Sequence, residues 1–340
     1  MGNFRSHGRS LRGVLCLLGG AVLLFLCLAG LIACSGEVYD PSAGTLYLEE
    51  GSGYGEPVTD AQTGSVLEIP SSADPFAEAA HVLRAEFLNT GESDAILLRV
   101  DDAVILLDTG ESDDYAAIRG RLDACGITRI DHLVISHFDN DHIGSAAQIL
   151  QDFSVGAVYM PDYVRESVLY RRMMGTLEVL PGVTVHRVTE DMTVDLPNGH
   201  MKLTPTKLYE AGLVLGSDDS HVAEENNFSL ITTVKFGEIN LLLLGDAEQD
   251  RLLEFMATLG GACAYDLIKI PHHGGYDKAL GDLLRMNSGL RYCMVHAGSA
   301  SRVEANLVTA IRSAGAAAYF TYNGTVSFAT DGVSMVVEQK

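Results

Sequence analysis

The chain has 340 residues, 47% of them hydrophobic, with 23 basic against 45 acidic residues and a net charge of −22. This length suits one large domain or two medium ones, and the apolar fraction is that of a normal globular core. Because non-specific affinity for nucleic acid usually comes from a Lys/Arg surface, tight nucleic-acid binding is not expected. The acidity by itself indicates no more than solubility.

Residues 1–33 have the pattern of an export signal. Three arginines precede an unbroken apolar run over residues 13–33, and the run ends in the motif Leu31-Ile32-Ala33-Cys34. This motif resembles a bacterial lipobox, in which the signal is cleaved before Cys34 and the sulfur is lipidated. The run is also long enough to span a bilayer uncleaved. We predict a lipoprotein, anchored through Cys34 to the extracellular face of the bacterial cytoplasmic membrane.

An acidic segment separates this signal from the rest of the chain. Residues 35–80 contain nine acidic residues and no basic one, and they show no sustained periodicity. Such a composition predicts a flexible tether over 34–80. The remaining residues, 81–340, are predicted to form the folded domain.

The domain opens with short strands joined by tight polar turns. Strands are expected at 85–89, 95–100 and 103–107. Ser112 is the predicted N-cap of a helix that runs to about Cys125.

A loop rich in metal-ligand residues follows the next strand. After the apolar run 133–135 come His137, Asp139, Asp141 and His142, and a helical pattern begins after residue 144. Ligands bind at the carboxyl ends of strands in open α/β sheets. The loop lacks the glutamate that would end an EF-hand calcium site. Two imidazoles and two carboxylates suit a hydrolytic metal centre.

The second half repeats the pattern of strands that end in polar residues. One apolar strand, 239–244, leads to Asp246, and another, 265–270, leads to His272 and His273. Further strands are expected at 155–160, 183–188, 192–196, 201–203, 228–234, 292–296, 317–322 and 325–329. Further helices are expected after Asp246 and at 164–174, 280–286 and 303–314. The alternation within each half suggests an αββα sandwich, two sheets faced by helices.

The His-x-Asp-x-Asp-His loop resembles the signature loop of the metallo-β-lactamase superfamily, His-x-His-x-Asp-His. Asp139 in place of the second histidine resembles the branch that contains the extracellular domain of the ComEC competence proteins. The stretches 87–95, 108–110 and 271–274 resemble that branch as well. The resemblance implies the αββα fold of the superfamily, here as a stand-alone lipoprotein.

The resemblance also implies a centre with two divalent metal ions, Zn²⁺ or Mn²⁺. Its implied ligands are His137 and Asp139 for one ion, Asp141, His142 and His273 for the other, Asp246 as the bridge, and Asn227 for a ligand that the family usually supplies as histidine. The same resemblance places Asp94 and Asp108 in support of the metal loop. A carboxylate at position 139 favours Mn²⁺ or Mg²⁺ more than imidazole does, although Zn²⁺ stays open.

These features predict an exported hydrolase that acts on small or polymeric phosphodiesters. Two ions about 3.5–4 Å apart can share a hydroxide that attacks phosphorus. Asp141 and His272 are the predicted catalytic residues, and His296, Arg302 or neither of them is expected to face the substrate. Two alternatives stay open. One is a β-lactamase or lactonase, which Asp139 disfavours, and the other is a non-catalytic lipoprotein that binds metal or a cell-wall ligand.

Overall fold

The computed structural model describes residues 45–46, 74–210, 212–216 and 225–340. The export segment and most of the tether lie outside these residues, so both stay predictions. Within the described part of the chain, no helix is long and apolar enough to cross a membrane.

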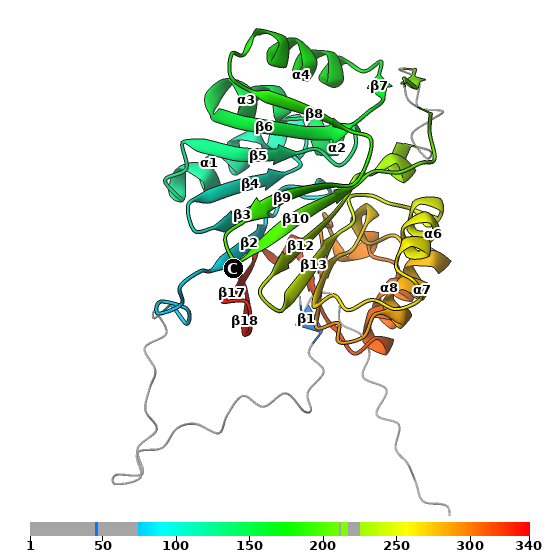
Figure 1. Ribbon diagram of the computed structural model, residues 1–340. Helices are drawn as coiled ribbons and strands as arrows, with labels where there is room; N and C mark the ends of the chain where they lie inside the picture. The colour runs from blue at the N-terminus through cyan, green and yellow to red at the C-terminus, as the bar shows by residue number, and fades with distance from the viewer. Residues whose placement is uncertain (1–44, 47–73, 211, 217–224) are drawn as a thin grey trace, which may run out of the picture. The chain divides into compact units, whose positions relative to one another are not determined.

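Two large sheets form the centre of the domain (Figure 1). The strands of the first sheet are β2 (Leu83–Phe87), β3 (Ile96–Val100), β4 (Ala103–Leu107), β5 (Arg129–Val134), β6 (Ser154–Pro161), β8 (Thr184–Val188), β17 (Val326–Thr330) and β18 (Met335–Gln339). They lie side by side in the order β18-β17-β2-β3-β4-β5-β6-β8.

The second sheet has the order β1-β16-β15-β14-β13-β12-β10-β9. Its strands are β1 (Thr45–Leu46), β9 (Met192–Leu196), β10 (Gly199–Thr204), β12 (Ile231–Phe236), β13 (Ile239–Leu243), β14 (Leu267–Lys269), β15 (Tyr292–Val295) and β16 (Ala317–Phe320). A short parallel pair, β7 (Val164–Arg165) and β11 (Val214–Leu215), stands apart.

Helices cover the outer face of each sheet, so the predicted αββα sandwich is confirmed (Figure 1). Three helices pack on the first sheet, namely α1 (Tyr115–Ala124), α3 (Ala146–Asp152) and α4 (Val168–Val179). Three pack on the second, namely α6 (Gln249–Thr258), α7 (Lys278–Met286) and α8 (Ala305–Ser313). The short α2 (Asn140–Ile143) lies in the predicted metal loop.

Strand β3 shows why both faces of the first sheet are apolar. Ile96 and Leu98 point into the core between the sheets, whereas Leu97 points to the core beneath the helices. Successive strand residues point to opposite faces, so a strand buried on both sides becomes a continuous apolar run.

Two local predictions were wrong. Ser112 is not the cap of α1, because a 3-10 turn over Ser112–Asp114 precedes the helix and Glu111 is the N-cap of that turn. The Ser112 hydroxyl instead donates to the carbonyl oxygen of Gly144 at 3.1 Å. The helix expected at 164–174 starts later, at Val168, where Ser167 caps it. Strand β18 was not predicted.

Parallel pairing brings the loops that follow the strands together. Leu107 at the end of β4 lies opposite Val134 at the end of β5, and Leu243 of β13 lies opposite Lys269 of β14. The polar residues that follow these strands therefore emerge at neighbouring positions. Gly144 fixes the metal loop against this edge, since its amide donates to the Gly110 carbonyl oxygen at 2.8 Å.

We expect Gly144→Ala to destabilise the fold, because an added Cβ would lie 2.4 Å from the backbone carbon of Glu111. Overpacking of this kind typically costs about 1–3 kcal/mol. Gly175→Ala in α4 is the matched control, since nothing lies within 4 Å of its added Cβ. That variant should gain about 0.5–1 kcal/mol. Chemical denaturation measures both, and equal effects of the two substitutions would contradict the packing of the loop.

Candidate metal centre

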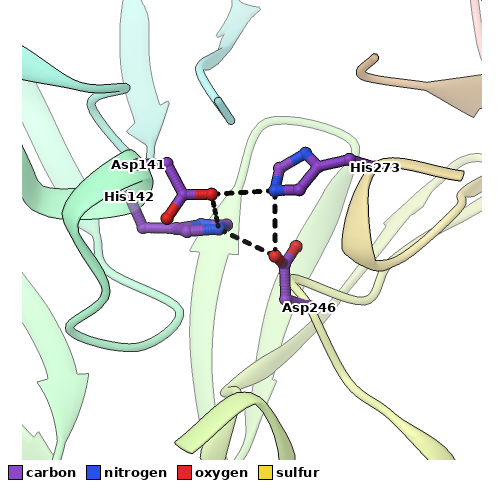
Figure 2. Close-up of side chains that lie close together, drawn as sticks. All are labelled: Asp141, His142, Asp246 and His273. Carbon is purple, nitrogen blue, oxygen red and sulfur yellow. Dashed lines mark hydrogen bonds and ion pairs between the residues drawn. The ribbon is translucent and has the colours of Figure 1, made fainter. Parts of the chain in front are cut away.

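Four side chains predicted as metal ligands converge at the carboxyl ends of β5, β13 and β14 (Figure 2). One ligand atom from each of Asp141, His142, Asp246 and His273 lies within 4.8 Å of the others. His273 Nε2 lies 2.8 Å from Asp141 Oδ2, and both it and His142 Nε2 lie 3.1 Å from Asp246 Oδ2. The structure therefore brings together the residues predicted for the second ion and the bridge.

An unusual backbone conformation places the two consecutive histidines. His272 and His273 have φ values of 48° and 53°, in the left-handed region that side chains other than glycine rarely adopt. Such residues cost about 1–3 kcal/mol each and persist where the surroundings hold them. The turn lets the His272 amide donate to Asp246 Oδ1 at 3.2 Å while the His273 ring reaches Asp141.

Asp108 orients the His142 ring. Its Oδ2 lies 2.8 Å from His142 Nδ1, and its Oδ1 accepts a hydrogen bond from the Ser136 amide at 2.7 Å. Because Nδ1 is engaged, Nε2 of His142 is the atom left to face the cluster. A carboxylate behind a ligating histidine fixes the ring and raises its basicity, as in many metal sites.

The charges of the cluster explain its protonation without a metal. Burial would lower the pKa of His142, but the carboxylates of Asp246, Asp141 and Asp108 outweigh it and raise that pKa well above its ordinary value. Burial is likewise outweighed at His273, whose pKa rises to about 10. The same imidazoles, with Lys269, hold the pKa of Asp246 well below its usual range against its burial. Imidazolium cations therefore balance the buried carboxylates.

These residues fit a divalent cation. Nε2 of His142 is buried and makes no well-aligned hydrogen bond within the described residues. This atom and Nε2 of His273 face one small volume together with oxygens of Asp141 and Asp246. A bound cation would supply there the positive charge that the imidazolium protons now provide.

Lys269 contacts the cluster from within the core, and this role was not predicted from the sequence. Its side chain is fully buried and ion-paired with Asp94. Its ammonium also donates to the Gly245 carbonyl oxygen at 2.9 Å and lies 3.4 Å from Asp246 Oδ1. A single lysine inside an apolar strand was the available signal, because lysine is almost never fully buried unless it is paired.

The residues predicted for the first ion are only partly assembled. His137 Nε2 lies 3.8 Å from Asp139 Oδ2. Asn227 does not join them, because its Oδ1 accepts the amide hydrogen of Arg251 at 3.0 Å and so caps helix α6. The prediction that Asn227 is a ligand is therefore not supported.

A cleft of about 360 Å³ opens beside His273. Arg302 and the half-exposed His272 line it, so of the two candidates for facing the substrate Arg302 is the one that lies at the cleft. The other candidate, His296, is fully buried, with Nδ1 3.2 Å from Asp94 Oδ1. His272 Nδ1 lies 3.0 Å from Glu248 Oε1, and its Nε2 lies 3.5 Å from the side-chain nitrogen of Asn226.

The family model of the Metallo-beta-lactamase superfamily matches residues 88–288, more than half of the chain. The ComE operon protein 3 of Bacillus subtilis (strain 168) is 27% identical over 154 residues, which are 45% of this chain and 18% of that protein. The chain thus spans less than a fifth of the length of this curated relative.

Similar solved structures have low identity to this chain. The metallo-beta-lactamase fold protein YhfI of Bacillus subtilis is 11% identical with a TM-score of 0.45, and the match covers 72% of this chain and 99% of that one. A diphosphatase from the PhnP family is 16% identical with a TM-score of 0.38, and the match covers 71% and 87%.

We expect the metal-free protein to lose stability as the pH rises from about 6.5 to about 10. The pKa of His273 is raised on folding, so its contribution is complete below the unfolded value and is lost as the pH passes the folded value. Metal affinity should rise over the same interval, because binding displaces that proton. Thermal unfolding with and without chelator, and calorimetric titration with Mn²⁺ or Zn²⁺, measure both trends. A metal-free protein equally stable at both ends of the interval would contradict this charge balance.

We expect Lys269→Met to destabilise the protein by about 3–5 kcal/mol, because it leaves Asp94 buried without its partner. Lys278→Met is the control, since that lysine is 83% exposed and pairs with Asp282 at the surface. The control should change stability by less than about 0.5 kcal/mol. Urea denaturation separates the two, and a small effect at position 269 would argue against the ion pair.

Proposed function

Because this chain belongs to the metallo-β-lactamase superfamily, we propose that it is an exported, metal-dependent phosphodiesterase. The observation that carries the proposal is the convergence of Asp141, His142, Asp246 and His273 next to an open cleft. Asp139 adds a carboxylate where an all-histidine site would have imidazole, and this favours Mn²⁺ as well as Zn²⁺. We propose two divalent ions, with Asp246 between them.

Divalent cations at such a centre act as Lewis acids and provide a nucleophile at neutral pH. The chain's own residues orient the reaction. Asp141 and Asp246 contact His273, which lines the cleft, and the His272 amide donates to the second oxygen of Asp246. These groups define where the phosphorus of a substrate has to lie.

His272 is suited to protonate the leaving group. Its hydrogen bond to Glu248 raises the pKa of its imidazole above the ordinary value, which favours the protonated ring. Glu248 lies at Nδ1 and the Asn226 amide nitrogen lies 3.5 Å from Nε2, so the ring has to turn away from one of these neighbours to give a proton to a substrate. Half of the His272 side chain is exposed, and it lines the cleft.

The cleft indicates the kind of substrate. Arg302 is the guanidinium in its lining and suits a phosphate oxygen, although it is now paired with Glu92. The small volume and the acidity of the chain favour a small diester, or the end of a polymer, over long nucleic acid. Nucleotides, teichoic-acid phosphodiesters and phosphocholine esters all have this chemistry.

The proposed location is the extracellular face of the cytoplasmic membrane. The support is the apolar run before Cys34 and the lipobox-like motif that ends it. Lipidated Cys34 would make the membrane a constant partner, and the tether 34–80 would hold the domain away from it.

We expect residues 35–340, purified without chelator, to hydrolyse bis(p-nitrophenyl) phosphate with added Mn²⁺ or Zn²⁺. Asp141→Ala and Asp246→Ala should each lower the rate more than about 100-fold, since even residues behind ligands cost 10–100-fold. Asp282→Ala is the control, because that carboxylate lies at the surface with Lys278.

The alternatives give different results in the same assay. If the protein holds no metal and shows no turnover with any ion, the enzyme hypothesis is wrong and the chain is a non-catalytic binding lipoprotein. Hydrolysis of a β-lactam or lactone, without hydrolysis of the diester, would make the chain a β-lactamase or lactonase.

A further inference from the structure

A second cavity, of about 410 Å³, lies on the first sheet and has no role in the proposal above. It shares no lining residue with the cleft beside His273. Its lining comes from the neighbouring strands β3, β2, β17 and β18 (Figure 1), and helix α1 adds Arg121. Pockets of this volume commonly bind small molecules.

The side chains around this cavity carry more positive charge than the chain as a whole. The whole chain has 23 basic and 45 acidic residues, and the cleft beside His273 is lined by one arginine and three carboxylates. The cavity on the first sheet is lined instead by four basic and three acidic side chains, namely Arg84, Arg99, Arg121 and Lys340 with Asp74, Glu86 and Glu338. A local excess of positive charge in an acidic protein indicates an anionic ligand.

Two of the arginines lie directly opposite each other in the sheet. Arg84 of β2 and Arg99 of β3 are paired in register. Their neighbours Ala85 and Leu98 point into the core between the sheets, so both arginines point away from it. Like charges placed opposite each other on neighbouring strands are destabilising. An anion that contacts both guanidinium groups would remove this repulsion.

The carboxylates of the cavity do not pair with all of its guanidinium groups separately. Glu86 is buried and shared, since its Oε1 accepts from Arg99 Nη2 at 3.1 Å and from Arg121 Nη2 at 2.8 Å. Asp74 accepts from Arg84. Three guanidinium groups therefore share two carboxylates.

Hydrogen-bond donors are left over as well. A guanidinium has several N–H donors, and Nε of Arg99 is buried without a hydrogen-bond partner within the described residues. A buried donor without a partner costs free energy. The side chains of Arg84 and Arg99 are 33% and 28% exposed, so a ligand from solution can reach them.

We infer that this cavity binds a phosphate group carried by a small organic molecule. The planar guanidinium fork matches phosphate oxygens, and a tetrahedral phosphate can accept hydrogen bonds from more than one arginine at a time. The volume leaves room for an organic part beside the phosphate.

This site is distinct from the metal centre. Arg84 is near the start of β2 and Arg99 near the end of β3, whereas Asp94 lies in the turn that joins the other ends of these strands. The phosphate bound here is therefore not the one at the candidate metal centre. The inference does not depend on the proposed hydrolase activity.

The test is calorimetric titration of the protein with sn-glycerol 3-phosphate and with inorganic phosphate. Chelator is present throughout, so that no cation can hold phosphate at the metal centre. We expect one equivalent of glycerol 3-phosphate to bind. Arg84→Gln and Arg99→Gln should each weaken this binding about 10-fold or more, because each removes a charge-assisted hydrogen bond.

Arg119→Gln is the matched control. Arg119 lies on the same helix as Arg121, is 46% exposed and pairs with Asp123 at 3.4 Å, but it does not line the cavity. The affinity for glycerol 3-phosphate should stay unchanged in this variant.

Asp74→Asn separates ligand binding from damage to the fold. This change removes the carboxylate partner of Arg84, so the anion should bind more tightly, opposite to the effect of the arginine variants. A damaged fold would weaken binding in every variant.

Three results would overturn the inference. The first is no binding of glycerol 3-phosphate at millimolar concentrations, and the second is equal affinity in the wild-type protein, Arg84→Gln and Arg99→Gln. The third is binding of inorganic phosphate without binding of the ester, because the organic part would then have no place in the cavity.

If the arginine variants do not fold, a crystal of the wild-type protein soaked in tungstate decides the question, since this phosphate-like anion scatters anomalously. A peak in contact with Arg84 and Arg99 supports the inference, and peaks found only elsewhere overturn it.

Discussion

The ion pair between Lys269 and Asp94 is the interaction on which the rest of the centre depends. Lys269 ends β14 in the second sheet, whereas Asp94 lies in the turn between β2 and β3 of the first. The pair is buried from water, so neither charge is tolerated there without the other. Asp94 also receives the His296 ring, and its amide donates to the Asp141 carbonyl oxygen at 3.1 Å. These contacts thus join the two sheets, the loop that carries Asp141 and His142, and Asp246.

Around this pair, positive and negative groups alternate from the core outward. The ammonium neutralises Asp94 and one oxygen of Asp246, and the second oxygen of Asp246 faces two imidazoles. The strained His272-His273 turn and the oriented ring of His142 then hold the ligand atoms in position before any cation arrives. A preorganised set of this kind needs little rearrangement on binding, which strengthens the electrostatic effect of the site.

Sequence patterns predicted the parts that depend on local chemistry. The strand at 103–107 was predicted to the residue, and motifs at strand ends indicated Asp141, His142, Asp246 and His273, which the structure brings together. The role of Lys269 was not predicted, because one charged residue in an apolar run does not indicate which residue of another sheet will be its partner. The position of Asn227 could not be predicted, because only the path of the chain turns its side chain toward helix α6.

The pairing of β2 with β17 bears on the order in which parts of the domain fold during synthesis. Phe87 lies opposite Val326, so β2 and β17 can pair only after residue 326 has been synthesised. Contacts between residues so far apart in sequence form slowly, because a long loop has to close first. The turn that carries Asp94 follows β2 in the first sheet, whereas Lys269 ends β14 in the second sheet. Asp94 and Lys269 also come from distant parts of the sequence, so we expect the centre to form late in folding.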